Sequence, residues 1–323
     1  MRLIQTLAAA VATLALVTAA SAQQDYPNKA ITWVVPFTPA GQADTAARVL
    51  AKVAGDKLGQ QIIIDNRPGA GGIIGAEIVM NAKPDGYTIF YGSSGPMGIL
   101  PKLHKNLSYD PVKNFAPIAM VIYAPQMLAV HPSMPVNSLP ELVAYAKSNP
   151  GKVAFGSSGH GTQPHLLGEM LKLMAGIDLI HVPYRGAGRN VTDVVAGQVQ
   201  MIFETTAILL PHIQSGKLRA LAVAAEARSP LLPGVPTTAE NGYPKLTASF
   251  WSGVLAPAGT PAAIVDKLNG AINEILRSKE AQDGLARLSA EAKIGSPQDF
   301  AAFIASETPR WAAIANETGV KVD

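Results

Sequence analysis

Short apolar runs alternate with longer amphipathic stretches along this chain, and the alternation indicates its fold class. The apolar runs Ala30 to Val35, Ile62 to Ile64 and Tyr87 to Tyr91 predict strands, because each is bounded by residues that favour turns or loops. Between them, Thr45 to Leu58 and Ile73 to Ala82 place their apolar residues at helical spacing. Strands that alternate with helices in this order are typical of an α/β fold.

The alternation continues through the second half of the chain. A helix is predicted over Leu139 to Lys147, and strands are predicted near Val153, Ile180 and Met201, each followed by a helical pattern. The C-terminal third is predicted to be helical. Its apolar positions recur at helical spacing from Ile264 to Ile275 and again in a last helix over Pro297 to Glu317.

Two further apolar runs have the length needed to connect two lobes. Ala116 to Val130 contains two prolines, and proline is excluded from the middle of a central strand, so we expect two strand pieces joined by a crossing. Leu218 to Ala224 is long enough to cross back. These crossings predict a discontinuous first domain, residues 23–121 and 225–323, with a second domain, residues 122–224, inserted into it. Lobes joined by two strands can open and close about that hinge.

Two loops in the sequence have the form of anion sites. Residues 36–44 connect the strand that ends at Val35 to the following helix. In the second domain, Gly156 to Gln163 connect the strand Val153 to Phe155 to a helix that begins at Pro164. A loop of this kind presents free backbone N–H groups and the positive end of a helix dipole. Because ligands in open α/β sheets sit at the carboxyl ends of strands, the two loops predict a small carboxylate bound between the lobes.

Composition and the N-terminal segment restrict the class of protein. Residues 1–22 read as a secretory signal peptide cleaved after Ala22, with Arg2 before an apolar stretch and small residues at the cleavage site. The chain has 48% hydrophobic and 15% charged residues, which is typical of an ordered globular protein. It contains no cysteine, which excludes disulfides and thiolate chemistry. A net charge of +3 without a basic patch argues against a nucleic-acid partner.

Eight motifs distributed over the mature chain resemble one family in order. They are the segments 35–44, 65–72, 84–88, 109–111, 157–162, 181–186, 215–223 and 255–261, which read VPFTPAGQAD, DNRPGAGG, PDGYT, YDP, SSGHGT, HVPYRG, SGKLRALAV and LAPAGTP. On these motifs the chain resembles the substrate-binding proteins of tripartite tricarboxylate transporters, often called the Bug family. The resemblance runs from about residue 25 to the C-terminus.

The resemblance implies a type II-like periplasmic binding protein fold, with two lobes and two crossing strands. It implies a receptor that captures a small organic carboxylate (a dicarboxylate or tricarboxylate, an acidic amino acid or an aromatic acid) and delivers it to integral-membrane transporter subunits. The loops expected to hold the ligand correspond to Phe37 through Asp44 and Ser157 through His165. We expect a monomer in the periplasm, with no cofactor and no metal.

Two positions depart from the family pattern where ligand contact is expected. Ala40 replaces a glycine in the first loop, and Glu204 followed by Thr205 replaces an aspartate followed by asparagine or serine. A carboxylate at Glu204 would repel an anionic ligand unless it is bridged by water or meets an amine or a hydroxyl. Glu204 is therefore a candidate selector for amino or hydroxy acids, and Arg185 could hold a second carboxylate in bidentate fashion.

The remaining candidates have both a functional and a structural explanation. Asp44 could bind ligand or stabilise its own loop, and His165 could meet an anion or serve only in packing. The serine and threonine hydroxyls could donate to a carboxylate or cap helices. The full set of expected ligand-binding residues is Phe37, Thr38, Ala40, Gly41, Asp44, Ser93, Ser94, Ser157, Ser158, Gly159, Thr162, His165, Arg185 and Glu204.

Other functional classes find weaker support in the sequence. Gly156 to His160 lacks the last glycine of a nucleophile elbow, and Gly69 to Gly75 has isoleucine at the third glycine of a dinucleotide fingerprint. His160 and His165 are five residues apart, which does not place them on one helical face for a shared metal. A ligand receptor for signalling stays open as an alternative, and an enzyme acting on a carboxylate or ester is the less favoured one.

Overall fold

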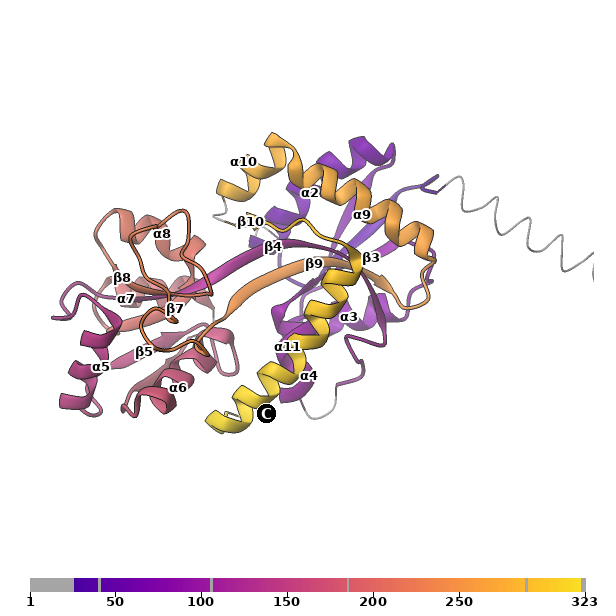
Figure 1. Ribbon diagram of the computed structural model, residues 1–323. Coiled ribbons are helices and arrows are strands. Elements are labelled where there is room, and N and C mark those ends of the chain that lie inside the picture. Colours follow the sequence, from indigo (N-terminus) through magenta and orange to yellow (C-terminus); the bar gives the residue numbers. More distant parts are fainter. Residues whose placement is uncertain (1–25, 40–41, 105–106, 185, 288–289, 321–323) are drawn as a thin grey trace, which may run out of the picture.

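Two α/β lobes joined by two long strands make up the molecule (Figure 1). The computed structural model describes residues 26–39, 42–104, 107–184, 186–287 and 290–320; the predicted signal peptide lies outside them. The strands follow the order β2-β1-β3-β9-β4-β7-β5-β6, with β10 and β8 also paired to β4. The predicted two-lobed α/β fold is confirmed.

The first lobe is formed by both ends of the chain. Its sheet has β1 in parallel between β2 and β3, and β9 runs antiparallel to β3. The elements of this lobe are β1 (Ile31–Val35), α2 (Gln42–Leu58), β2 (Ile62–Asn66), η1 (Ala70–Gly72), α3 (Ile73–Met80), β3 (Thr88–Ser93), η2 (Gly95–Ile99), α4 (Leu100–Leu103), α9 (Ala262–Arg277), α10 (Lys279–Arg287), β10 (Glu291–Ala292) and α11 (Pro297–Thr318).

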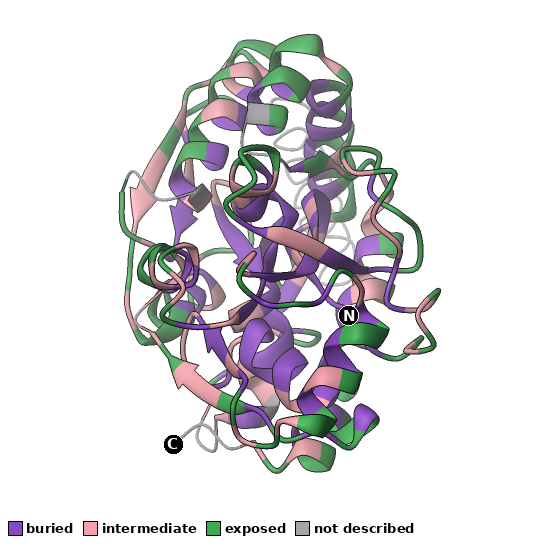
Figure 2. Cartoon of the chain, turned by 90° about the vertical axis from the view of Figure 1, so that its left-hand side faces the viewer, coloured by how far each residue is buried: buried purple, intermediate pink, exposed green. Residues whose placement is uncertain are grey.

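Each face of the first sheet has its own apolar core. Leu50 of α2 and Leu268 of α9 pack on one face with Trp33, and Phe300 of α11 packs on the other face with Phe90. The helical spacing noticed in the sequence is the reason, because it gives α9 a continuous apolar stripe to lay on the sheet. Figure 2 shows the buried residues gathered in the interior and the exposed ones on the outer helices.

The second lobe has the same layered plan. Strand β5 lies in parallel between β6 and β7, with one core formed by Leu167 and Phe203 and another by Val191 and Leu209. The elements of this lobe are α5 (Leu139–Ser148), β5 (Ala154–Ser157), α6 (Gln163–Ala175), β6 (Ile180–Pro183), α7 (Ala187–Val195), β7 (Met201–Thr205), α8 (Thr206–Gln214) and β8 (Arg219–Ala224).

The first crossing differs from the prediction of two strand pieces. Strand β4 (Phe115–Val130) is continuous and belongs to both sheets. It tolerates its prolines because of where they lie. Pro117 stands next to a register shift, and Pro125 pairs with Ser249 at the last position before β4 enters the second sheet. At such irregular positions a missing N–H group removes little from the hydrogen-bond ladder.

The return crossing was predicted in the wrong place. Leu218 to Ala224 does not cross back, because β8 stays in the second sheet, antiparallel to β4. The chain returns through β9 (Ser249–Pro257), which pairs with β4 and then with β3. Residues between β8 and β9 stay with the second lobe, where the N–H of Ala248 donates to the carbonyl of Ala224 at 2.9 Å. The domain boundaries given above remain a prediction.

The last helix connects the two lobes along one side. It begins at a capping box, in which Ser296 and Asp299 each accept from the other's backbone N–H. Helix α11 then packs against β4, η2 and α4 and ends beside α6 (Figure 1). Phe300 near its start belongs to the core of the first lobe, and Trp311 near its end belongs to that of the second.

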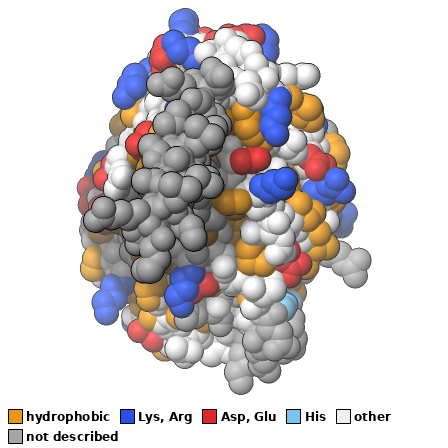
Figure 3. Space-filling view, turned by 90° about the vertical axis from the view of Figure 1, so that its right-hand side faces the viewer, with side chains coloured by type: hydrophobic (Ala, Val, Ile, Leu, Met, Phe, Trp, Pro, Cys, Tyr) orange, Lys and Arg blue, Asp and Glu red, His pale blue; other side chains and the backbone are white. Residues whose placement is uncertain are grey.

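The outer surface carries mixed charge. On the face shown in Figure 3, acidic, basic and hydrophobic side chains are interspersed over the described residues. Lys52 of α2 pairs with Glu280 of α10 at 3.1 Å, both well exposed, and such surface pairs contribute little to stability. None of the helices in the described part of the chain combines the length and apolarity needed to cross a bilayer.

Candidate functional site

A cavity of about 720 Å³ lies where residues of the two lobes face each other. The ends of β1, β2 and β3 lead into its wall from the first lobe, and those of β5, β6 and β7 from the second. This is the place where open α/β sheets bind ligands. The lining residues are Phe37, Ala70, Gly71, Ile73, Ser93, Ser94, Gly95, Pro96, Ile99, Leu100, His104, Gln126, Ser158, His160, Gly161, Thr162, Gln163, Pro164, Ala187, Glu204, Thr205, Ile208 and Phe250.

Three helices of the second lobe begin at this cavity. Thr162 and Thr205 are the N-cap residues of α6 and α8, and Ala187 is the first residue of α7. Neither threonine side chain caps its helix; Thr162 Oγ1 instead donates to the carbonyl of Gly159 at 2.7 Å. Helix N-termini without a side-chain cap keep N–H donors and a positive partial charge available. This end of the cavity therefore suits an anion.

The first loop is held in place by a polar network behind the cavity. Asn66 Nδ2 donates to the carbonyl of Phe37 at 3.1 Å and to Asp44 Oδ1 at 2.9 Å. Arg48 Nε donates to Asp44 Oδ2 at 2.9 Å, and only 2% of Asp44 is exposed. Through these contacts Asp44 ties the start of α2 to the end of β2.

Glu204 is a buried carboxylate in the wall of the second lobe. Ser158 Oγ donates to its Oε2 at 2.8 Å, and the backbone N–H of Thr205 donates to its Oε1 at 3.0 Å. Burial raises the pKa of Glu204, and these two hydrogen bonds act against that rise. The carboxyl group therefore faces the cavity with both oxygens already oriented by the protein.

A chain of amide groups joins the cavity wall to both crossing strands. Gln163 Nε2 at the start of α6 donates to the carbonyl of Ser249 on β9 at 3.0 Å. Gln126 Nε2 on β4 donates to Gln163 Oε1 at 3.2 Å. Gln126 Oε1 and Thr205 Oγ1 are buried and have no hydrogen-bond partner within the described part of the molecule. The cavity wall thus has two buried oxygen atoms, Gln126 Oε1 and Thr205 Oγ1, that can accept a further hydrogen bond.

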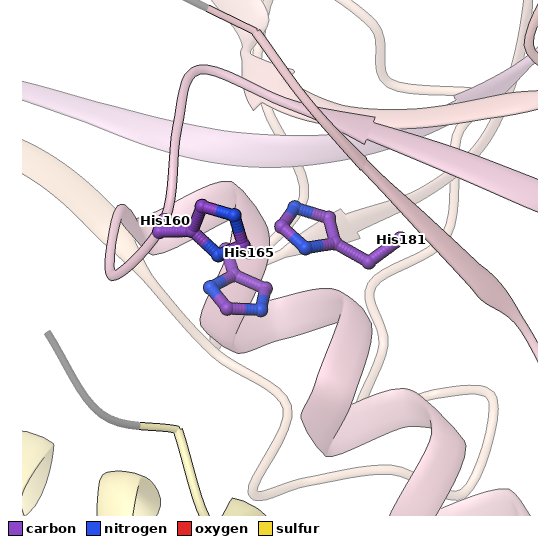
Figure 4. A group of neighbouring side chains, drawn as sticks. All are labelled: His160, His165 and His181. Carbon is purple, nitrogen blue, oxygen red and sulfur yellow. The ribbon is translucent and has the colours of Figure 1, made fainter.

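Three histidines come together at the second loop (Figure 4). His160 lines the cavity, whereas His165 of α6 and His181 of β6 are stacked behind it, with ring centroids 3.8 Å apart and an interplanar angle of 8°. The N–H of Gly161 donates to His165 Nδ1 at 3.0 Å, and His181 Nε2 lies 2.7 Å from Ser157 Oγ. Burial lowers the pKa of His165 to about 4 and that of His181 to about 3.

The histidine cluster was not expected from the sequence, because His181 reaches it from another strand. Its candidate ligand atoms lie within 4.8 Å of one another, which invites comparison with a metal site. A metal ion lies about 2.1 Å from a ligating nitrogen and near the plane of its ring. The stacked rings of His165 and His181 are parallel, so one ion cannot lie in both planes without a ring rotation. In this arrangement the stacked rings contact the second loop, through Gly161 and Ser157.

The expected site residues fall into three groups. Those that line the cavity are Phe37, Ser93, Ser94, Ser158, Thr162 and Glu204. Those set apart from its lining are Thr38, which is exposed, Gly159, and the buried Asp44, Ser157 and His165. Ala40, Gly41 and Arg185 lie outside the described residues. Whether any of the fourteen contacts ligand stays a prediction.

Several cavity residues were missed by sequence reasoning. Gln163 is the last residue of the predicted second loop, but it was not among the individual residues expected to bind ligand. Gln126 and Phe250 carry no such signal, because they lie on the crossing strands β4 and β9 and reach the cavity only through the tertiary fold.

Comparisons with known proteins agree with this architecture. The family described as "Tripartite tricarboxylate transporter family receptor" matches residues 46–320. Protein BugT of Bordetella pertussis is 41% identical over 298 residues, which is 92% of this chain and 91% of that protein.

Two solved structures are similar over nearly their whole length. The structure of R. palustris Rpa4515 with adipate has a TM-score of 0.80 and 35% identity, covering 92% of this chain and 99% of that one. MatC (Rpa3494) from Rhodopseudomonas palustris with bound malate has a TM-score of 0.76 and 32% identity, covering 90% and 99%. The chain therefore belongs to the tripartite tricarboxylate transporter receptor family, whose members are periplasmic solute-binding receptors and not enzymes.

Proposed function

We propose that this protein binds a small organic carboxylate in the cavity between its lobes and delivers it, chemically unchanged, to a tripartite tricarboxylate-type membrane transporter. The observation that carries the proposal is the start of α6, α7 and α8 at one end of that cavity. Backbone N–H groups at helix starts bind carboxylates without a charged side chain. The adipate and malate in the two solved relatives support the same ligand class.

Helix ends alone do not supply the affinity. A micromolar dissociation constant corresponds to about 8.2 kcal/mol, whereas helix-end electrostatics contribute about 0.3–2 kcal/mol per charge. The rest comes from direct hydrogen bonds and from burial of the ligand's carbon frame. Phe37, Ile208 and Phe250 provide apolar surface in the cavity for that frame.

Binding is coupled to closure of the lobes about β4 and β9. Because the cavity wall includes residues of both lobes, a ligand that touches both favours the closed arrangement. The shift in population is set by the difference in affinity between the closed and open arrangements. The protein then acts as a monomeric periplasmic receptor after removal of residues 1–22.

A thermal-shift screen of the chain from Gln23 tests the ligand class. A bound ligand stabilises the native state by about 2.7 kcal/mol at a hundredfold excess over Kd. We expect the melting temperature to rise with a carboxylic acid and not with its neutral amide. No rise with any monocarboxylate, dicarboxylate, tricarboxylate or aromatic acid would refute carboxylate binding. Delivery is tested separately, by uptake of the bound acid into vesicles that carry the membrane subunits, with and without the receptor.

A further inference from the structure

Glu204 has acceptor capacity beyond the contacts that it already makes. Each of its two oxygens accepts one hydrogen bond, from Ser158 Oγ and from the N–H of Thr205, and a carboxylate offers about four lone-pair sites. Only 5% of Glu204 is exposed, so bulk water does little to satisfy the remaining sites. Among the described residues that line the cavity there is no lysine or arginine to neutralise it.

Gln126 presents a second acceptor on the same wall, and its orientation is fixed by its neighbours. The carbonyl of Ser249 can only accept, so Gln163 must turn its Nε2 toward Ser249 and its Oε1 toward Gln126. Gln126 must then donate from Nε2 to Gln163, which leaves Oε1 as the unpaired atom. Gln126 is 2% exposed, and a buried acceptor without a partner is unfavourable.

Both acceptors line the cavity, although they project from opposite faces of the sheet at the end of β7. Strand β4 pairs with β7 so that Gln126 lies opposite Thr205 and Met127 lies opposite Glu204. Side chains directly opposite each other on paired strands share a face. Gln126 and Thr205 therefore share one face and Glu204 points to the other, and all three line the cavity. The cavity wall thus offers a buried carboxylate, an amide oxygen and the unpaired hydroxyl of Thr205.

This wall discriminates between ligands by the functional group that the ligand directs toward Glu204 and Gln126. An unsubstituted dicarboxylate brings a second negative charge and no donor, so at Glu204 and Gln126 it meets acceptors and like charge. A ligand with an ammonium or hydroxyl group on its carbon frame donates to Glu204 or Gln126. Specificity built on buried polar groups is strong, because the wrong ligand leaves those groups unpaired.

We propose that Glu204 and Gln126 select a carboxylic acid whose carbon frame carries a hydrogen-bond donor, that is, a hydroxy acid or an amino acid. The proposal rests on the proposed function, since it names the substrate class of the same cavity. The carboxylate of the ligand lies toward the starts of α6 and α7, and its donor lies toward Glu204, next to the start of α8.

Calorimetric titration with matched acids tests the proposal on the chain from Gln23. Succinate, malate and aspartate share a four-carbon frame and differ only in having no added donor, a hydroxyl or an ammonium group. Glutarate, 2-hydroxyglutarate and glutamate repeat the comparison with five carbons. In at least one of the two series, we expect an acid with an added donor to bind at least tenfold more tightly than the unsubstituted acid. In the four-carbon series malate or aspartate is compared with succinate, and in the five-carbon series 2-hydroxyglutarate or glutamate is compared with glutarate. A larger gain for the ammonium than for the hydroxyl would assign the charge of Glu204 as the selecting feature, and a larger gain for the hydroxyl would assign its hydrogen bond.

Two variants and a control locate the selection in the protein. Glu204→Gln is expected to weaken aspartate binding at least tenfold and to strengthen succinate binding, because one negative charge is removed. Gln126→Met removes the amide oxygen at similar size and is expected to reduce the preference by threefold or more. Glu317→Gln changes an exposed residue of α11 and should leave every affinity unchanged. The wild-type ranking is decisive even if a variant does not fold.

The outcomes separate this inference from the proposed function. Equal binding of the substituted and unsubstituted acids by the wild-type protein would overturn the donor preference and leave the carboxylate receptor intact. A preference that survives Glu204→Gln and Gln126→Met would overturn the assignment to this wall. Binding of none of the six acids, together with a flat thermal-shift screen, would overturn both proposals.

Discussion

Substitution of Glu307 is expected to destabilise the whole molecule, because this residue joins the last helix to a crossing strand. Its Oε2 accepts from Trp251 Nε1 of β9 at 3.0 Å and from Trp311 Nε1 at 2.9 Å. Its Oε1 accepts from Arg310 Nη1 at 2.9 Å. Both tryptophans are 0% exposed, so their N–H groups cannot turn to water when the carboxylate is removed.

The expected loss follows from these contacts. Each buried donor that is left without a partner costs about 1–3 kcal/mol, so Glu307→Ala should lower the free energy of unfolding by about 2–6 kcal/mol. Arg310 adds little, because 32% of its side chain is exposed and can be hydrated. Glu307→Gln keeps one oxygen for the indoles and should cost only about 1–2 kcal/mol, the loss of a charge-assisted bond.

Urea denaturation followed by tryptophan fluorescence and by far-ultraviolet circular dichroism measures the effect. Glu317→Ala is the matched control, since it makes the same change at an exposed position of the same helix and should stay within about 0.5 kcal/mol of the wild type. The m value should not change, because the same surface is exposed on unfolding. A Glu307→Ala protein as stable as Glu317→Ala would refute the view that the two indoles depend on this carboxylate.

Three further expectations concern titration, loop support and packing. The pKa values of His165 (about 4) and His181 (about 3) lie below the unfolded value of about 6.5. The unfolded chain therefore binds protons first, and the free energy of unfolding should fall as pH drops from about 6.5 toward 4, by up to about 1.4 kcal/mol per pH unit for each ring. Denaturation midpoints independent of pH across this window would contradict the neutral stack. Asp44→Ala should lower the free energy of unfolding by about 1–3 kcal/mol but should not change the preference for acid over amide in the thermal-shift screen. Loss of that preference in a folded variant would show that Asp44 contacts the bound acid directly. Gly253→Ala should lower the free energy of unfolding by about 1–3 kcal/mol or more, because a Cβ there would lie 2.6 Å from the carbonyl oxygen of Ala119. The control Gly270→Ala, which has open space around it in a helix, should be neutral or stabilising. Equal melting temperatures for the two variants would argue against close packing at Gly253.

The elements of the fold could be predicted from the sequence because their signals are local. Apolar spacing is sufficient to place helices such as α2 and α9, and residues 297 to 317 were read as the last helix within one residue of its observed end. The prediction for β4 was wrong. The general rule that excludes proline from central strands led to two predicted strands where the structure has one continuous strand. Whether a strand position is central or irregular depends on its partners, and those are set by the tertiary fold.

The loops of the candidate site could also be predicted from the sequence, since a strand followed by a glycine-containing loop and a helix is a local pattern. Phe37, Ser158 and Thr162 line the cavity as that pattern suggests. The family motifs were likewise readable in order along the chain, which is why the resemblance named the family to which the chain belongs.

Only the tertiary structure decided which side chains share the site. Gln126 meets Gln163 across 37 positions of sequence, and Ser249 lies 86 positions beyond Gln163. His181 reaches His165 because β6 lies in parallel beside β5. Spacing along the chain carries no information on such contacts, since strand pairing and register fix them. The sequence determined the kind of fold and the family, and the packing of β4, β7 and β9 determined the chemistry of the cavity wall.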